Sequence, residues 1–227
     1  MDAKPRISVV IAAKNEGPNI GDVIRGCQRH VDEVIVVDGH STDDTRAVAE
    51  GLGCRVLSDH DRGKGDAIRT GIQAVTGDIV VFVDADGSHD PDDIPRMIEP
   101  IVKGEADHVS GSRLLGGSSE MHGSFDECFR LMGSSFITAC INWRFGVRLS
   151  ESQNGFRAIR TDVARSLGLR ENIASIEQEM VIKTVRQGYR MAEIPAHEYR
   201  RKHGESHIRL TRVSFRFVYT LVKYLFL

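Results

Sequence analysis

The sequence Ile79-Val80-Val81-Phe82-Val83-Asp84-Ala85-Asp86-Gly87-Ser88 joins an apolar run to two closely spaced aspartates. Continuously apolar runs of this length are typical of parallel strands that helices cover on both faces. Similar runs rich in β-branched residues stand earlier, at 7–11, 34–37 and 55–57. Between and after them the pattern predicts helices at about 19–27, 42–52, 65–75 and 91–102. This alternation predicts a Rossmann-like α/β fold, with a mostly parallel sheet flanked by helices.

The second half of the chain departs from this alternation. Residues 114–124 are rich in Gly and Ser and predict a loop, whereas 125–145 predicts one long helix. Further elements are predicted as strands at 155–160 and 190–194 and a helix at 176–187. We therefore predict one catalytic-type domain over residues 1–207.

Residues 208–227 predict a C-terminal amphipathic helix. Residues 196–216 contain six Lys or Arg and two acids, and an apolar stretch follows directly and extends to Leu227. A basic segment beside an apolar helix suits an anionic membrane surface. The alternative interpretation is that this tail packs as a core or dimer helix.

Composition limits the classes of function. The chain has 227 residues, 41% of them hydrophobic and 27% charged, and its net charge is −2. This balance is typical of a soluble globular protein, and without a basic excess it argues against nucleic-acid binding. The cysteines at 27, 54, 128 and 140 lack zinc-ligand spacing, and no signal-like or bilayer-length segment is seen. The expected location is the cytoplasm, at the inner face of the membrane.

Acidic and polar residues follow three of the predicted strands. Glu16 stands shortly after the first strand, Asp38 ends the second, and Asp84 ends the fourth. Ligands of open parallel sheets bind beyond these carboxyl ends. Asp84 and Asp86, two apart at a strand end, would repel each other unless a cation lay between them, which favours Mg²⁺ or Mn²⁺. The alternative is a solvated turn.

Gly63-Lys64-Gly65 is a basic, glycine-rich element at the start of a predicted helix. It predicts either a phosphate contact or a tight turn, and the local sequence favours neither. The glycine fingerprint of dinucleotide-binding folds does not follow the first strand, where Lys14-Asn15-Glu16 stands instead.

Taken together, these motifs resemble the family 2 glycosyltransferases of GT-A fold, and most closely the branch that acts on polyprenyl phosphates, such as dolichyl-phosphate mannose and glucose synthases. The resemblance extends from about residue 6 to 207. Its motifs are Asn15-Glu16, 38–45, Gly63-Lys64-Gly65, Asp84-Ala85-Asp86, Gly111-Ser112-Arg113, 153–157 and 201–206.

The resemblance implies a nucleotide-sugar site. Glu16 and Asp38 would hold the base and ribose, and Arg201 would reach the diphosphate. Asp84, Asp86 and Ser88 would form the metal site, with Asp86 as the principal ligand. The implied donor-binding set comprises Ala12, Lys14, Glu16, Asp38, Lys64, Asp84, Asp86, Arg201 and His207. Three of these depart from the family, which often has Pro at Ala12, Tyr at Lys14 and Lys at His207.

The resemblance also implies a site for an acceptor phosphate, formed by Arg113, Arg130 and Ser134. Arg130 and Ser134 are four apart on the predicted helix and therefore share a face. Together with Asp86, these three are the candidate catalytic residues.

The function implied is an inverting transfer of a hexose-type sugar from a nucleotide donor to a polyprenyl phosphate, with Mg²⁺ or Mn²⁺ as cofactor. A phosphate with a second pKa of ~6 is already ionised at neutral pH and needs orientation rather than a strong base. The first half of the chain also resembles glucosyl-3-phosphoglycerate synthases, so a soluble phosphorylated acid is the alternative acceptor. A hydroxyl acceptor would need a base, for which Glu177, Glu179 and Glu151 are the candidates. A third hypothesis is a nucleotide-binding module without catalysis.

Overall fold

The computed structural model describes residues 4–119, 125–203 and 210–226, with side chains except at 125–130 and 210–215. Its strands are β1 (Ile7–Ala13), β2 (Glu33–Asp38), β3 (Arg55–Ser58), β4 (Ile79–Asp84), β5 (His108–Ser112), β6 (Arg157–Arg160) and β7 (Met191–Pro195). Its helices are α1 (Gly17–Gln28), α2 (Thr45–Gly51), α3 (Lys64–Ala74), α4 (Ile94–Val102), α5 (Arg113–Gly116), α6 (Phe125–Phe145), α7 (Thr161–Ser166), α8 (Ser175–Arg186) and α9 (Leu210–Phe226), and a 3₁₀ turn spans Pro91–Asp93.

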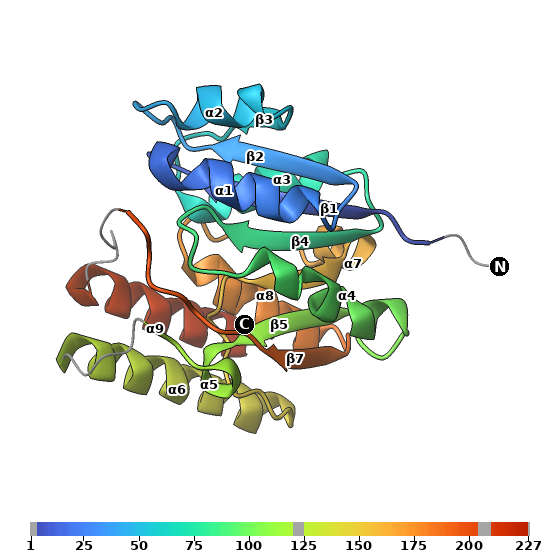
Figure 1. Ribbon diagram of the computed structural model, residues 1–227. Coiled ribbons are helices and arrows are strands. Elements are labelled where there is room, and N and C mark those ends of the chain that lie inside the picture. The colour runs from blue at the N-terminus through green and yellow to red at the C-terminus, as the bar shows by residue number, and fades with distance from the viewer. Residues whose placement is uncertain (1–3, 120–124, 204–209, 227) are drawn as a thin grey trace.

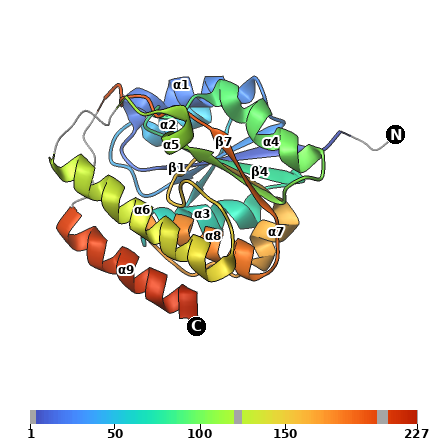
Figure 2. The same ribbon diagram turned by 90° about the horizontal axis from the view of Figure 1, so that it is seen from below.

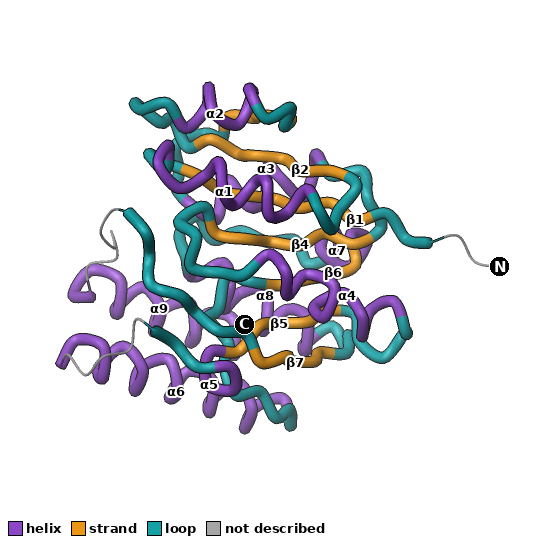
Figure 3. The backbone as a smooth tube through the Cα atoms, in the orientation of Figure 1, coloured by secondary structure: helices purple, strands orange, loops and turns teal. Residues whose placement is uncertain are grey.

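The strands form one sheet in the order β3-β2-β1-β4-β6-β5-β7 (Figures 1 and 3). The pairs β1–β2, β1–β4, β2–β3 and β5–β7 are parallel, whereas β6 pairs antiparallel with both β4 and β5. The mostly parallel sheet predicted from the sequence is thus confirmed. The order reverses at β1, which lies between β2 and β4, and such a switch point is where α/β sheets bind ligands.

Helices cover both faces of the sheet (Figure 2). Alternate strand residues explain this, since Val9 and Ile11 pack with α1, α2 and α4 on one face, whereas Val10 packs with α3, α7 and α8 on the other. The strands β1, β2 and β4 are therefore apolar along most of their length, as their sequences indicate.

The C-terminal helix α9 lies beside α6 and α8 (Figures 1 and 2). A third apolar cluster joins them, with Ile141 from α6, Val181 from α8 and Leu225 from α9. One face of the predicted tail helix is therefore buried against the domain. Within the described residues, no helix combines the length and the apolar character that crossing a bilayer would need.

Gly71 lets α3 lie close to β1. A Cβ at this position would stand 2.9 Å from Val10 Cγ2 and closer still to Cγ1. Gly51, the last residue of α2, has no neighbouring atom within 4 Å of the same hypothetical Cβ. The two positions form a matched pair.

We expect Gly71→Ala to lower the free energy of unfolding by about 1–3 kcal/mol, because forced overpacking outweighs the better helix propensity of alanine. Gly51→Ala, the control, should be neutral or stabilising by up to about 1 kcal/mol. Urea denaturation of the two variants checks this. Equal stabilities would contradict the close approach of α3 to β1.

Candidate nucleotide and metal site

The carboxyl ends of β2, β1 and β4 bring the predicted acidic residues together. In the strand register Asp38 lies opposite Ala13, and Asp84 lies opposite Ala12. Since neighbouring strands are about 4.8 Å apart, the backbones of Asp38 and Asp84 lie roughly 10 Å from each other across β1. Asp38 and Asp86 are buried, and Asp84 is half-buried.

The loops that follow β1 and β2 are tied to each other. Asn15, at a φ of 56°, accepts a hydrogen bond on Oδ1 from the Thr42 backbone N–H at 2.8 Å, and its own N–H donates to Ser41 Oγ at 2.9 Å. The Glu16 backbone N–H donates to Thr45 Oγ1 at 2.8 Å, and the Glu16 carboxylate accepts from Asn19 Nδ2, also at 2.8 Å. These contacts fix Glu16 at the edge of the sheet. Lys14 instead pairs with Asp61 at 2.9 Å on the surface.

Lys64 joins two carboxylates at this edge. Its Nζ lies 2.5 Å from Asp84 Oδ1 and 2.7 Å from Glu177 Oε1, which α8 supplies from 113 residues further along the chain. Burial would raise the pKa of the Asp84 carboxyl, but Lys64, then His89 and Arg201, outweigh burial and lower this pKa to about 2. In the same way Asp84 and Glu177 overcome burial and raise the pKa of Lys64 above its usual range. Asp84 is therefore ionised at every physiological pH.

Glycines make room for this group of charges. At Gly155, a Cβ would stand 2.6 Å from Asp84 Oδ2 and 3.0 Å from Lys64 Nζ. At Gly65 it would overlap the backbone of Glu171, and Gly63 has a φ of 107° that favours glycine. Gly63-Lys64-Gly65 thus forms a close-packed turn that directs the Lys64 side chain at Asp84. In this structure the Lys64 amine contacts the carboxylates of Asp84 and Glu177.

Asp86 pairs with the second cation of the site. Arg201 Nη2 lies 2.8 Å from Asp86 Oδ2, and the Ser88 backbone N–H donates to Asp86 Oδ1 at 3.0 Å. Carboxylate and hydroxyl oxygens are the hard ligands that Mg²⁺ and Mn²⁺ prefer. The described residues hold no cluster of three or more His, Cys, Asp or Glu side chains suited to a metal. This donor set fits an ion that takes its remaining ligands from water and substrate phosphates.

Two of the three residues predicted for the acceptor, Arg113 and Ser134, have side chains in the described part of the chain. Arg113 donates from Nε to Glu151 Oε1 at 2.7 Å, and its Nη1 lies 3.0 Å from Glu198 Oε1. Ser134 is half-buried on α6, one turn from Thr138, whose hydroxyl lies 2.9 Å from Ser152 Oγ. Arg130 belongs to α6, but its side chain lies outside the described part, as does His207 altogether.

Several residues of the site carried no assignment in the sequence. Arg157 is 1% exposed and donates to the backbone oxygens of Asn154 at 2.6 Å and Ser152 at 2.8 Å, so it shapes the turn that places Gly155 on Asp84. Glu198 is one of two acids in the basic stretch 196–216. An acid in such a stretch is a signal in the sequence that it pairs with a cation elsewhere in the fold. Glu179, by contrast, was a candidate base in the sequence, and it accepts backbone hydrogen bonds from Arg170 and Glu171, which is a structural role.

Comparison with known proteins gives a consistent picture. A family model described as glycosyl transferase family 2 matches residues 8–167. The chain is 27% identical over 206 residues to Glycosyltransferase AglJ of Haloferax volcanii, a match that spans 90% of this chain and 66% of that protein, just under two thirds. It is 29% identical over 203 residues to a dolichyl-phosphate hexose transferase of the same organism, covering 88% of this chain and 85% of the relative.

Among solved structures, the fold is similar to glucosyl-3-phosphoglycerate synthase from Mycobacterium tuberculosis in complex with Mn²⁺, UDP-glucose and phosphoglyceric acid. The TM-score is 0.77 at 26% identity, over 97% of this chain and 80% of the synthase. Other structures of that synthase hold UDP with Mn²⁺ or Mg²⁺.

Removal of the Lys64 charge should release the Asp84 carboxyl from its low pKa. In Lys64→Met we expect the pKa of Asp84 to rise from about 2 to its ordinary 3.8 or above, because burial then acts with less opposition. In the wild type the ion pair of Lys64 with Asp84 stabilises the fold only while Asp84 is ionised. This stabilisation is therefore lost as the pH falls from about 4 to about 2. A carbon-13 NMR titration of the carboxyl groups measures the midpoint.

The control is Lys14→Met, which removes an exposed cation paired with Asp61. It should leave the Asp84 midpoint near its wild-type value. A midpoint that stays near 2 in Lys64→Met would show that Lys64 does not hold Asp84 in its ionised form.

Proposed function

The chain belongs to glycosyl transferase family 2 and is a nucleotide-sugar-dependent glycosyltransferase, and we propose that it transfers a hexose to a polyprenyl phosphate. The observation that carries the proposal is the arrangement of charges at the carboxyl edge of the sheet. Three acids at this edge are already engaged by cations, Asp84 and Glu177 by Lys64 and Glu151 by Arg113. Such carboxylates are poor general bases, which suits an acceptor that arrives ionised.

The donor would lie across β1, with its nucleoside near Glu16 and Asp38 and its diphosphate toward Asp86. A divalent ion held by Asp84, Asp86 and Ser88 would neutralise charge on the diphosphate as it leaves. Arg201, already 2.8 Å from Asp86, is placed to add a second positive charge there. The structurally similar synthase binds UDP-glucose and Mn²⁺, which supports a nucleotide-sugar donor and a divalent ion in this proposal.

An acceptor phosphate oxygen would attack the anomeric carbon from the side of α6. A bond forms between that carbon and the acceptor oxygen while the bond to the donor diphosphate breaks, so a nucleoside diphosphate leaves. A single displacement of this kind inverts the configuration. Arg130 and Ser134, on one face of α6, are proposed to orient the acceptor, together with Arg113 in the sequence-based hypothesis.

The second candidate is a soluble phosphorylated acid as acceptor. Its support is the structural similarity to glucosyl-3-phosphoglycerate synthase, which extends over 97% of this chain. The polyprenyl phosphate is preferred for two reasons. A related protein is named dolichyl-phosphate hexose transferase, and dolichyl phosphate is a lipid phosphate. The second reason is an exposed apolar face on α6 and α9.

An apolar face on α6 and α9 supports contact with a membrane. We define it as the exposed side chains Met132, Phe136 and Trp143 of α6 and Val218, Tyr219, Val222 and Phe226 of α9. The two helices lie side by side, and three arginines on them or just beyond α6 are exposed, namely Arg144, Arg148 and Arg216. Apolar side chains flanked by arginines suit an anionic bilayer surface, from which a lipid acceptor would enter.

The acceptor is tested by incubating the enzyme with Mn²⁺, radiolabelled UDP-glucose or GDP-mannose, and either polyprenyl phosphate in vesicles or 3-phosphoglycerate. We expect label in the organic phase and a product of inverted configuration. In Asp86→Asn or with EDTA, turnover should fall on the order of 100-fold or more, because charge on the leaving diphosphate is no longer neutralised.

Asp162→Asn, which alters an exposed ion pair between Asp162 of α7 and Arg160 of β6, is the control and should transfer at the wild-type rate. A water-soluble product with retained configuration would support the second candidate instead. Nucleotide binding without transfer to either acceptor would support the non-catalytic hypothesis.

The apolar face makes a separate prediction. Trp143→Glu and Phe226→Glu should each lower binding to phosphatidylglycerol vesicles about tenfold or more, because each places a charge where an apolar side chain would enter the bilayer surface. Co-sedimentation measures the bound fraction. Val102→Glu, at an exposed apolar residue of α4, should bind like the wild type. Equal binding by all variants would exclude this face as the membrane contact.

A further inference from the structure

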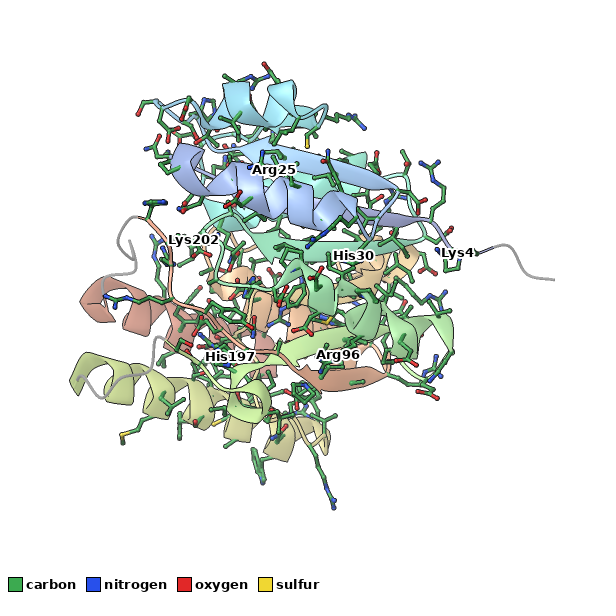
Figure 4. All side chains as sticks on the ribbon, viewed as in Figure 1. Lys4, Arg25, His30, Arg96, His197 and Lys202 are labelled. Carbon is green, nitrogen blue, oxygen red and sulfur yellow. The ribbon has the colours of Figure 1, made fainter. Side chains whose placement is uncertain are left out.

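A segment that follows β7 crosses the carboxyl edge of the sheet. We name residues 196–203 the strap. Its Ala196 N–H donates to Ser112 O at 3.1 Å, and its Tyr199 N–H donates to Ser88 O at 2.8 Å. At the far end, Lys202 lies 3.2 Å from Asp22 of α1. His197 lies against Gly116 of α5, and Figure 4 shows Lys202 at the other end of the strap, so the strap runs along the carboxyl edge of the sheet from α5 to α1.

The strap is held most firmly at Glu198. One carboxylate oxygen of Glu198 lies 3.0 Å from Arg113 Nη1, and the other accepts from Ser118 Oγ at 2.8 Å. Arg113 is in turn fixed by Glu151, which accepts from its backbone N–H at 2.8 Å as well as from its guanidinium. The three side chains are 20% exposed or less. Partly desolvated ion pairs supported by additional hydrogen bonds hold geometry far better than surface ion pairs.

Close packing adds to this anchor. A Cβ at Gly116 would overlap the backbone of Ala196, so α5 and the strap are in direct backbone contact. The Glu198 N–H donates to Gly117 O at 3.1 Å, and the Ser119 N–H donates to Glu198 O at 2.7 Å. The strap is therefore paired, as far as Glu198, with the segment that follows α5.

Arg201 lies three residues beyond this anchor and reaches Asp86 at 2.8 Å. Three residues span at most about 10 Å, so the position of Glu198 limits where the Arg201 guanidinium can lie. The Arg113 charge is balanced by the carboxylates of Glu151 and Glu198. Burial alone would lower the pKa of Arg113, but these two carboxylates outweigh burial and raise it. Release of Arg113 to another anion would leave Glu151 and Glu198 buried without a cation.

We propose that Arg113 and Glu198 are positioning residues, which fix the strap so that Arg201 is held at Asp86 and at the donor diphosphate. The role of Arg201 at the diphosphate rests on the proposed function, whereas the anchoring of the strap does not. Under this proposal Arg113 acts on the donor side of the reaction. The sequence-based hypothesis, in which Arg113 binds the acceptor phosphate, predicts an effect on the acceptor side.

Limited trypsin digestion tests the anchor without any substrate. The strap carries cleavable bonds after Arg200, Arg201 and Lys202. In Glu198→Gln, mass spectrometry should show cleavage at these bonds about tenfold faster than in the wild type, because local opening governs such cleavage. Glu99→Gln, which removes an exposed ion pair with Lys103, is the matched control and should be cleaved at the wild-type rate. Unchanged cleavage in Glu198→Gln would overturn the proposal.

A double-mutant cycle with Arg201 tests the positioning. Glu198→Gln should raise the donor KM and lower kcat/KM on the order of tenfold, with the acceptor KM unchanged. In an Arg201→Ala background the same substitution should have little further effect, because both act through one guanidinium. Melting temperatures of all variants separate these effects from loss of folding.

Each outcome decides a different claim. Additive effects in the cycle, or a raised acceptor KM in Glu198→Gln and Arg113→Lys, would overturn the positioning role while the proposed function stands. A wild-type chain that transfers no sugar to any acceptor would remove the proposed function, and the digestion result would still decide whether Glu198 anchors the strap.

Discussion

Compensation of buried carboxylates is the constraint on which the rest of the site depends. Acids gather at the carboxyl edge of the sheet because three strands end there, and burying them without cations would cost several kcal/mol each. The chain supplies these cations from distant segments, with Lys64 from the start of α3, Arg113 from α5 and Arg201 from the strap. Each ion pair also ties its segment to the sheet edge. The same ion pairs therefore set the geometry of the site and attach α3, α5 and the strap to the sheet edge.

Local sequence patterns predicted the first half of the fold closely. The apolar runs at 7–11 and 79–83 became β1 and β4 with ends shifted by at most two residues, because strands buried on both faces leave a continuous apolar signal. The meeting of Asp38 and Asp84 followed from topology alone, since parallel strands that share a sheet end at the same edge. The long helix at 125–145 was predicted with its observed bounds, and its length made that possible.

Long-range partners were not readable from the sequence. The antiparallel pairing of β6 with β4 and β5 depends on contacts between residues 47 to 81 positions apart, which no periodicity records. The packing of α9 on α6 and α8 was left open for the same reason, because an amphipathic helix has the same pattern whether a core or a membrane covers it. Likewise, Arg113 was assigned through a motif, but its neighbours Glu151 and Glu198 come from 38 and 85 residues away.

The engaged state of these acids also bears on the choice of acceptor. A hydroxyl nucleophile needs a carboxylate that can take up a proton, and the lowered pKa of Asp84 shows that its ionised form is strongly favoured. A phosphate acceptor brings its own negative charge and asks instead for a cationic environment and correct alignment. Freeing Glu177 for base catalysis would require Lys64 to turn entirely toward Asp84, and freeing Glu151 would loosen Arg113 and with it the strap. The same ion pairs that build the site therefore favour an acceptor that needs no base.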